Sequence, residues 1–136
     1  RDLIRNRSET EKICVLDERN ELFPEGLPQG KNIDVLSGCS KKEGIPMLLR
    51  TMGPDCIAVD EITDPEDAYA LQQAANCGVQ LLATAHAASI ADFQQRSIYH
   101  PLWVNRIFPA FVILKRDKTY TLERMAQWVS SGLVQY

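Results

Sequence analysis

The sequence lacks the features that would direct a chain of 136 residues to a membrane or to nucleic acid. No apolar run approaches the roughly 20 residues that a membrane-spanning helix needs, and the N-terminus has no signal-peptide pattern. The formal net charge is −3, so no basic excess favours nucleic acid or an anionic membrane as the main partner. These absences predict a cytoplasmic protein without a nucleic-acid partner.

Cysteine and histidine are also scarce. The chain has four widely spaced cysteines without a CxxC pair and only two histidines, His86 and His100, which argues against a zinc site. We interpret the cysteines as reduced structural thiols of a cytosolic protein. The composition, 45% hydrophobic and 24% charged, predicts one modest domain that covers residues 1–136.

A phosphate-binding loop of the form GxxxxGK[ST] is missing as well. The nearest match, residues 26–32, has one residue too few between its glycines and places Asn32 where Ser or Thr should bind Mg²⁺. It also lies far after the preceding predicted strand, and no obvious helix follows it. We therefore reject this segment as a phosphate loop.

The segment around which the chain is organised is Cys56-Ile57-Ala58-Val59-Asp60-Glu61. A mostly apolar run that ends in two carboxylates is typical of a buried parallel strand whose charges reach the ligand-binding edge of an α/β sheet. This is the Walker B pattern of nucleoside-triphosphate hydrolases, in which Asp60 would hold Mg²⁺ and Glu61 would activate the attacking water. The hexapeptide alone fits an ordinary buried strand before an acidic helix-entry loop equally well.

The order of the other predicted elements favours a parallel sheet with helical crossovers. Residues 1–7 suit the end of a helix, residues 13–16 and 79–83 suit short buried strands, and residues 22–38 have no periodicity and are predicted to be irregular. Three helix starts have capping residues: Ser40 with Glu43, Asp64 before Pro65, and Ser89 with Asp92. Pro46 predicts that the helix after Ser40 begins late or kinks.

The C-terminal part has a different character. Residues 110–114 and 119–125 flank Lys115-Arg116-Asp117-Lys118, and their alternation predicts an antiparallel hairpin at a sheet edge. Residues 126–136 are predicted to form a short amphipathic helix followed by a loose tail.

These motifs occur in an order that resembles the type II secretion and type IV pilus motor ATPases, and within them the family of stage III sporulation protein AA. The resemblance rests on the Walker-B-like strand, the helix that ends at Leu48-Leu49-Arg50, the Thr84-Ala85-His86 box and the Asp17-Glu18-Arg19 strand end. It implies an α/β fold, a RecA-like P-loop ATPase core whose mainly parallel sheet has helices on both faces and a C-terminal antiparallel hairpin. Because the family's phosphate loop precedes a helix like residues 1–5, we expect this chain to lack its first strand and phosphate loop.

The resemblance also implies roles for individual residues. Glu18 corresponds to an acidic-box carboxylate near the γ-phosphate, His86 would sense that phosphate, and Arg50 would contact the nucleotide. Arg106 or Arg116 could act as an arginine finger toward a neighbouring subunit. Ordinary surface salt bridges, a helix-entry histidine or a solvated helix end explain the same residues. The motors carry an arginine where this chain has Thr63, so the task of that arginine is missing or moved.

The implied function is ATP hydrolysis with Mg²⁺ by a cytoplasmic ring, hexameric in the full-length protein and peripheral to the membrane. The ring would drive assembly of, or transport through, a sporulation channel at the forespore membrane, with the channel's membrane proteins as partners. Without its phosphate loop, the chain is expected neither to hydrolyse nor tightly to bind ATP, and to be a monomer or weak dimer. Two alternatives stay open: a non-catalytic interaction module of the same complex, and a flavodoxin-like ligand-binding domain.

Overall fold

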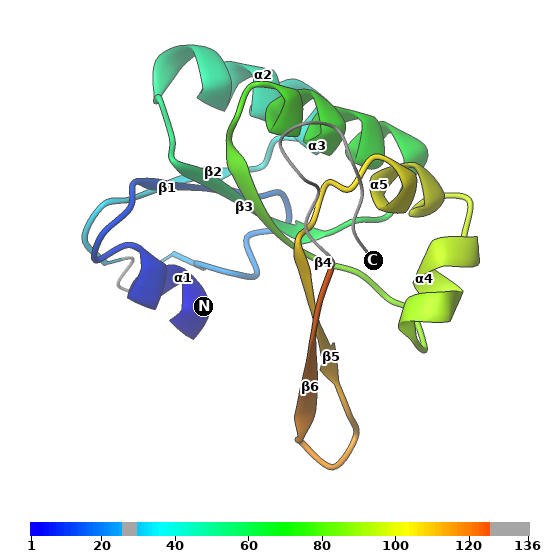
Figure 1. The fold of residues 1–136 in the computed structure, drawn as a ribbon. Helices are drawn as coiled ribbons and strands as arrows, with labels where there is room; N and C mark the ends of the chain where they lie inside the picture. The colour runs from blue at the N-terminus through cyan, green and yellow to red at the C-terminus, as the bar shows by residue number, and fades with distance from the viewer. Residues whose placement is uncertain (26–29, 126–136) are drawn as a thin grey trace, which may run out of the picture. The chain divides into compact units, whose positions relative to one another are not determined.

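The computed structural model describes residues 1–25 and 30–125 of the chain (Figure 1). Two units are recognised, Arg1–His86 and Ala87–Tyr136, and we describe each by itself.

A four-stranded parallel sheet in the order β2-β1-β3-β4 forms the centre of the first unit. Ile13 of β1 lies opposite Ile33 of β2 on one side and Cys56 of β3 on the other. The central strand β1 is buried along its whole length, as expected for a parallel strand covered on both faces. The strands are β1 (Ile13–Asp17), β2 (Ile33–Ser37), β3 (Cys56–Glu61) and β4 (Gln80–Thr84).

Helices cover both faces of this sheet, as predicted. Figure 1 shows α2 (Lys41–Thr51) and α3 (Pro65–Asn76) on one face and α1 (Asp2–Arg7) on the other. Ile4 of α1 belongs to a buried cluster with Val15, whereas Gly44 of α2 meets the next residue of the strand, Leu16. A side chain on Gly44 would approach Leu16 to 2.6 Å, so glycine lets α2 lie close to the sheet.

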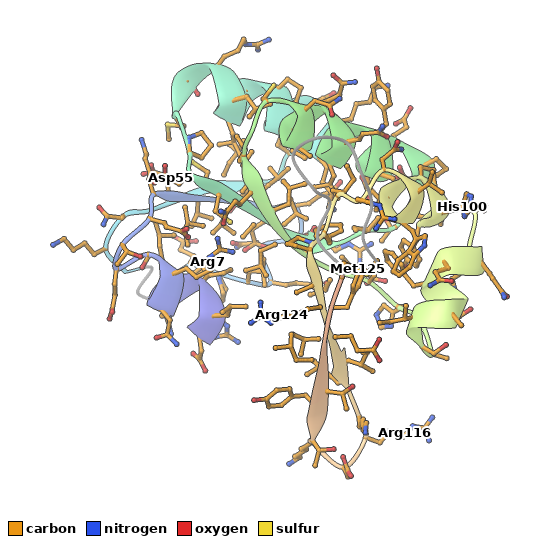
Figure 2. The ribbon with its side chains drawn as sticks, in the orientation of Figure 1. Arg7, Asp55, His100, Arg116, Arg124 and Met125 are labelled. Atoms are coloured by element: carbon orange, nitrogen blue, oxygen red, sulfur yellow. The ribbon has the colours of Figure 1, made fainter. Side chains whose placement is uncertain are left out.

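The predicted helix starts are confirmed. Ser40, Asp64 and Ser89 each accept a hydrogen bond from the backbone N–H three residues later, at 3.3, 3.0 and 3.1 Å. The late start expected from Pro46 is wrong, because α2 begins at Lys41 and contains the proline. The start of β3 is tied to that of β1, since Asp55 accepts a 2.8 Å hydrogen bond from the Lys12 N–H (Figure 2).

The prediction that residues 22–38 are irregular is wrong for Ile33–Ser37, which forms β2. This strand lies at the edge of the sheet and pairs only with β1, so its middle residues are half-buried. An edge strand needs neither a continuous apolar run nor strict alternation, and Gly30 and Gly38 on either side have the turn conformations that suggested a loop.

The second unit contains the predicted antiparallel hairpin, which is confirmed. Its predicted place at the edge of a sheet is wrong, because among the described strands it forms a two-stranded sheet of its own. Phe111 on β5 is the centre of an aromatic cluster, with ring centroids 5.1 Å from Phe93, 5.6 Å from Trp103 and 6.3 Å from Phe108. The elements are α4 (Ile90–Gln95), α5 (His100–Val104), β5 (Ala110–Leu114) and β6 (Tyr120–Arg124).

Two sequence predictions for this unit have other outcomes. Helix α5 was not predicted, since it spans only five residues and carries Pro101 in its first turn, where proline is tolerated. The helix predicted at residues 126–136 lies outside the described residues. Among the described helices, none is both long and apolar enough to cross a bilayer.

The cysteines should differ sharply in reactivity. Burial raises the pKa of Cys14, and it raises the pKa of Cys56 to about 11, so about one Cys56 thiol in a thousand would be ionised at pH 8. With Ellman's reagent at pH 8 we expect exposed Cys77 to react first, half-buried Cys39 more slowly, and the other two only after denaturation. A Cys77→Ser variant should lose the fast phase. Rapid native labelling of Cys56 would contradict the buried position of β3.

Candidate functional site

The carboxyl ends of β1 and β3 form the most polar edge of the sheet. These two strands are neighbours, and the chain leaves β1 toward β2 on one side and β3 toward β4 on the other. Such a reversal creates the crevice in which open α/β sheets bind ligands. The strand ends place Asp17-Glu18 and Asp60-Glu61 at this crevice.

An irregularity in β3 lies directly at the paired carboxylates. Ala58 and Glu61 of β3 pair with Leu82 and Thr84 of β4, so β3 uses one residue more than its partner between these points. Bulges of this kind often lie beside active sites, where they redirect a side chain. Here the irregular stretch includes Asp60 and ends at Glu61.

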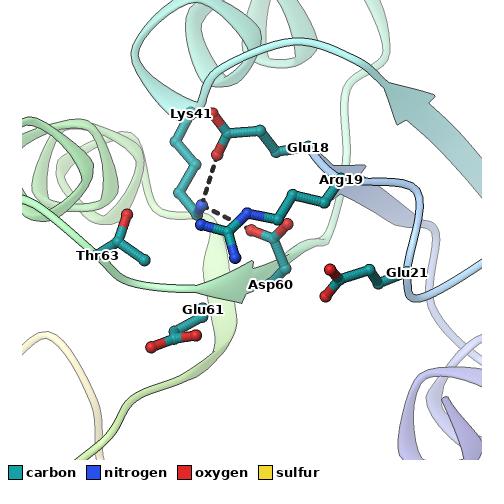
Figure 3. A pocket seen from close by; sticks show the side chains of 7 residues that line it. All are labelled: Glu18, Arg19, Glu21, Lys41, Asp60, Glu61 and Thr63. Atoms are coloured by element: carbon teal, nitrogen blue, oxygen red, sulfur yellow. Dashed lines mark hydrogen bonds and ion pairs between the residues drawn. The ribbon is translucent and has the colours of Figure 1, made fainter.

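A small recess of about 20 Å³ opens at this edge (Figure 3). Its acidic side chains outnumber its basic ones by four to two, so a free anion would be repelled whereas a cation, or an anion that brings a cation, would be attracted. The lining residues are Glu18, Arg19, Glu21, Lys41, Asp60, Glu61 and Thr63.

Lys41 is the centre of the charge network. Its side chain is 1% exposed, and Figure 3 shows it reaching from α2 toward Glu18 and Asp60. The Nζ atom lies 2.6 Å from Oδ1 of Asp60, 3.1 Å from Oε2 of Glu18 and 3.7 Å from Oδ2 of Asp67. One ammonium group therefore joins β3, the end of β1 and α3.

The environment keeps this lysine charged. Burial disfavours the ammonium form, but the contacts with Asp60 and Glu18 and the nearby charge of Asp67 outweigh burial, and the pKa of Lys41 is raised. Stability that depends on this raised pKa is complete at neutral pH and is lost only in strongly alkaline solution. Removing one partner of a buried ion pair typically costs about 3–5 kcal/mol, because the remaining charge is unbalanced.

Asp17 fixes the loop that carries Glu18. Its carboxylate is fully buried at the end of β1. Oδ1 accepts hydrogen bonds from the N–H groups of Glu21 and Leu22 at 2.9 and 3.1 Å, and Oδ2 accepts one from Phe23 at 2.8 Å. Three backbone donors hold the turn, so Asp17 acts as a structural residue next to the site.

Asp67 fixes Thr63, which lines the other side of the recess, in a similar way. Its Oδ2 accepts hydrogen bonds from both the N–H and the hydroxyl of Thr63, at 2.9 and 3.1 Å. Thr63 thus connects the end of the Walker-B-like segment to α3. The same oxygen of Asp67 lies 3.7 Å from Nζ of Lys41, so Thr63 and α3 are connected to the ammonium.

The structure brings together four of the seven candidate site residues. Glu18 and Asp60 share Lys41, Glu61 lines the same recess, and His86 Nε2 lies 3.4 Å from Glu61 Oε1 with its side chain largely exposed. Arg50 is exposed in the last turn of α2, roughly 13 Å along the helix from Lys41. Arg50 is not among the residues that line the recess.

The remaining arginines belong to the second unit. Arg106 follows α5 with a positive φ of 53°, and Arg116 lies in the hairpin turn (Figures 1 and 2). Their roles toward a nucleotide stay predictions.

Sequence reasoning missed Lys41, although a signal was present. Lys41, Gly44, Ile45 and Leu48 follow the i, i+3, i+4, i+7 spacing of the buried face of α2. A lysine at the first position of a helix also opposes the helix dipole, so it needs acidic partners nearby. The sequence therefore did indicate a buried counter-ion: a lysine on the apolar stripe of α2, in the stretch between the acidic ends of β1 and β3.

Comparison with known proteins defines first the class of fold and then the family. The X-ray structure of the Legionella pneumophila ATPase DotB superposes with a TM-score of 0.59 at 17% identity, covering 90% of this chain and 38% of DotB, so the two share a fold. A family model described as "Sporulation stage III, protein AA" matches residues 1–124, and the chain belongs to that family. The resemblance of the motifs to the stage III sporulation protein AA family is thereby confirmed.

A curated relative gives the extent of the match. The chain is 40% identical over 112 residues to stage III sporulation protein AA of Bacillus subtilis (strain 168). The alignment covers 79% of this chain and 36% of the relative, so the chain spans little more than a third of that protein's length.

The role of Asp17 can be tested by stability measurements. Asp17→Asn removes one acceptor and places an amide N–H₂ against backbone donors, so we expect a loss of about 1–3 kcal/mol in the free energy of unfolding. Urea denaturation followed by circular dichroism would measure it. Asp2→Asn, at an almost fully exposed position, is the control and should change stability by no more than about 0.5 kcal/mol. Equal effects of the two substitutions would show that the loop hydrogen bonds do not stabilise the fold.

Proposed function

We propose that this chain is the Walker B part of a secretion-type ATPase that hydrolyses ATP in the full-length protein. The observation that carries the proposal is the meeting of Asp60 and Glu61 with Glu18 at the crevice between β1 and β3. Two adjacent carboxylates at such a crevice suit a metal–nucleotide substrate, in which one carboxylate holds the metal and the other activates water. Family membership and the DotB-like fold support the same reading.

The residues present fit Mg²⁺, which would neutralise the charge of the substrate phosphates. In the described part of the chain, Oδ1 of Asp60 is buried and accepts no hydrogen bond of regular geometry. Its negative charge is balanced by the Lys41 ammonium, 2.6 Å away. No group of three or more histidine, cysteine or acidic side chains within residues 1–25 and 30–125 could hold a metal on its own. Mg²⁺ usually takes one or two carboxylates and completes its shell with phosphates and water, so Asp60 is its proposed ligand.

Glu61 is the proposed general base. Its carboxylate is half-exposed at the mouth of the recess, where it can accept a proton from the attacking water. His86 contacts the same carboxylate and would orient it or donate a hydrogen bond to the γ-phosphate. Glu18, held by Lys41, would face the phosphate side of the site.

The biological setting is part of the proposal. We infer a cytoplasmic ring, peripheral to the membrane, that drives assembly of or transport through a sporulation channel, with channel membrane proteins and not nucleic acid as partners. Arg50 and Arg106, or Arg116 in place of Arg106, would contact nucleotide within or across subunits. Both units, residues 1–136, would belong to one ATPase domain.

A non-catalytic interaction module is the second candidate, favoured by the hairpin. Val112, Leu114, Tyr120 and Leu122 are 48–80% exposed and occupy paired positions, Val112 opposite Leu122 and Leu114 opposite Tyr120. An exposed apolar face of this kind is typical of a protein-binding surface. The two candidates differ in whether the full-length protein turns over ATP.

Substitution of the two strand-end carboxylates separates their roles in the full-length protein. Glu61→Gln should leave nucleotide affinity near wild type and lower kcat by about 10²–10⁴-fold, since the amide cannot accept the proton. Asp60→Asn should instead weaken Mg²⁺-dependent nucleotide binding, because it removes charge beside the metal. Phosphate release and calorimetric titration with Mg²⁺-ATP would measure both.

Glu66→Gln is the matched control, because Glu66 is exposed and pairs only with surface Lys42 among the ion pairs found. It should change neither quantity. If the wild-type full-length protein showed no turnover, the interaction-module candidate would replace the ATPase, whereas full turnover of Glu61→Gln would exclude Glu61 as the general base. If Asp60→Asn and Glu61→Gln weakened nucleotide binding equally, the assignment of metal binding to Asp60 and of base catalysis to Glu61 would be wrong.

A further inference from the structure

Three carboxylates from three different elements surround a single point in the first unit, and a lysine ammonium fills it. Asp60 comes from β3, Glu18 from the loop after β1 and Asp67 from α3, and their oxygens lie 2.6–3.7 Å from Nζ of Lys41. Within the described residues no such acidic group could hold a metal on its own, but the combined negative charge attracts a divalent cation. The lysine therefore stands where such a cation would be attracted.

We propose that Lys41 is a positioning residue that acts as an internal substitute for the divalent cation and makes metal binding depend on nucleotide. This inference rests on the proposed function, because it concerns the metal ligand Asp60. In the absence of nucleotide, the ammonium holds Asp60 and Glu18 in place and excludes free metal from them.

The distances explain the exclusion. A divalent cation bound to Oδ1 of Asp60 would stand about 2.0–2.5 Å from that oxygen. The ammonium already lies 2.6 Å from the same oxygen, so the two cations would be nearly in contact and would repel each other strongly in a buried setting. Metal can bind Oδ1 of Asp60 without this repulsion only when Nζ moves away from that oxygen.

The contacts of Lys41 with Glu18 and Asp67 show how the ammonium can move away from Asp60 and still stay in the site. Glu18 is half-exposed and Asp67 is held by Thr63, so both can keep Lys41 when Asp60 turns to a metal. A nucleotide brings phosphate anions together with the metal, which offsets the added positive charge. Free metal has no such compensation and should bind weakly.

Direct metal binding tests the proposal without reference to turnover. In the nucleotide-free full-length protein, Mn²⁺ affinity measured by electron paramagnetic resonance should be weak for the wild type and for Lys41→Arg, which keeps the charge. Lys41→Met should bind Mn²⁺ about ten-fold or more tightly, because the competing charge is gone. The double variant Lys41→Met/Asp60→Asn should lose that gain.

Lys42→Met is the matched control, because it removes the neighbouring exposed lysine of the same helix and should behave as wild type. A purely structural role for Lys41 predicts lower stability of Lys41→Met with no gain in Mn²⁺ affinity, and that result would overturn the proposal. Wild-type protein that binds Mn²⁺ alone as tightly as Lys41→Met would overturn it as well.

A measurement on the wild type covers the case in which Lys41→Met does not fold. The ammonium resonance of Lys41, assigned with Lys41→Arg, should stay unchanged when Mg²⁺ is added alone and shift when Mg²⁺ is added with a non-hydrolysable ATP analogue. A shift with Mg²⁺ alone, or none with both, would refute the inference. Retained ATPase activity with no gain of Mn²⁺ binding would reject only the role of Lys41, whereas a gain without any ATPase activity would reject the proposed function.

Discussion

A single buried ammonium balances the carboxylates that the fold collects at one edge of its sheet. Parallel pairing of β1 with β3 places acidic strand ends side by side, and Asp67 adds a third charge from α3. Like charges this close and this far from water would oppose folding unless a cation neutralised them. Lys41 supplies that cation from the first residue of α2, so the start of this helix, its packing against β1 and the arrangement of the acidic groups depend on one another.

The order of the strands explains why the acidic groups gather at this edge of the sheet. The chain runs from β1 outward to β2, crosses back by way of α2 to β3, and continues by α3 to β4. The two crossovers with helices place α2 and α3 on the same face, as right-handed connections in one direction require. The crevice between β1 and β3 follows from this topology, and the pairing of β3 with β4 becomes irregular at its paired carboxylates.

Patterns within a short stretch of sequence were sufficient to predict the elements that are defined by residues close to one another in the chain. The caps at Ser40 and Asp64 and the apolar run of β3 are contiguous patterns, and each proved correct. Strand β2 could not be found in this way, because pairing with β1, distant in sequence, makes Ile33–Ser37 a strand. The partners of Lys41 come from three separate segments, so its role as counter-ion became visible only when the fold brought them together.

The carboxylates at this edge divide into two kinds according to what satisfies them. Asp17 accepts three backbone N–H groups and Asp67 is held by Thr63, so neither can turn to a ligand without losing structure. Asp60 is matched to a side-chain ammonium, and Glu61 contacts a largely exposed histidine. Exchanging such partners for a metal or a water leaves the backbone hydrogen bonds intact. The fold thus holds Asp17 and Asp67 through hydrogen bonds that include backbone donors, whereas Asp60 and Glu61 contact side chains that the proposed function would exchange for metal and water.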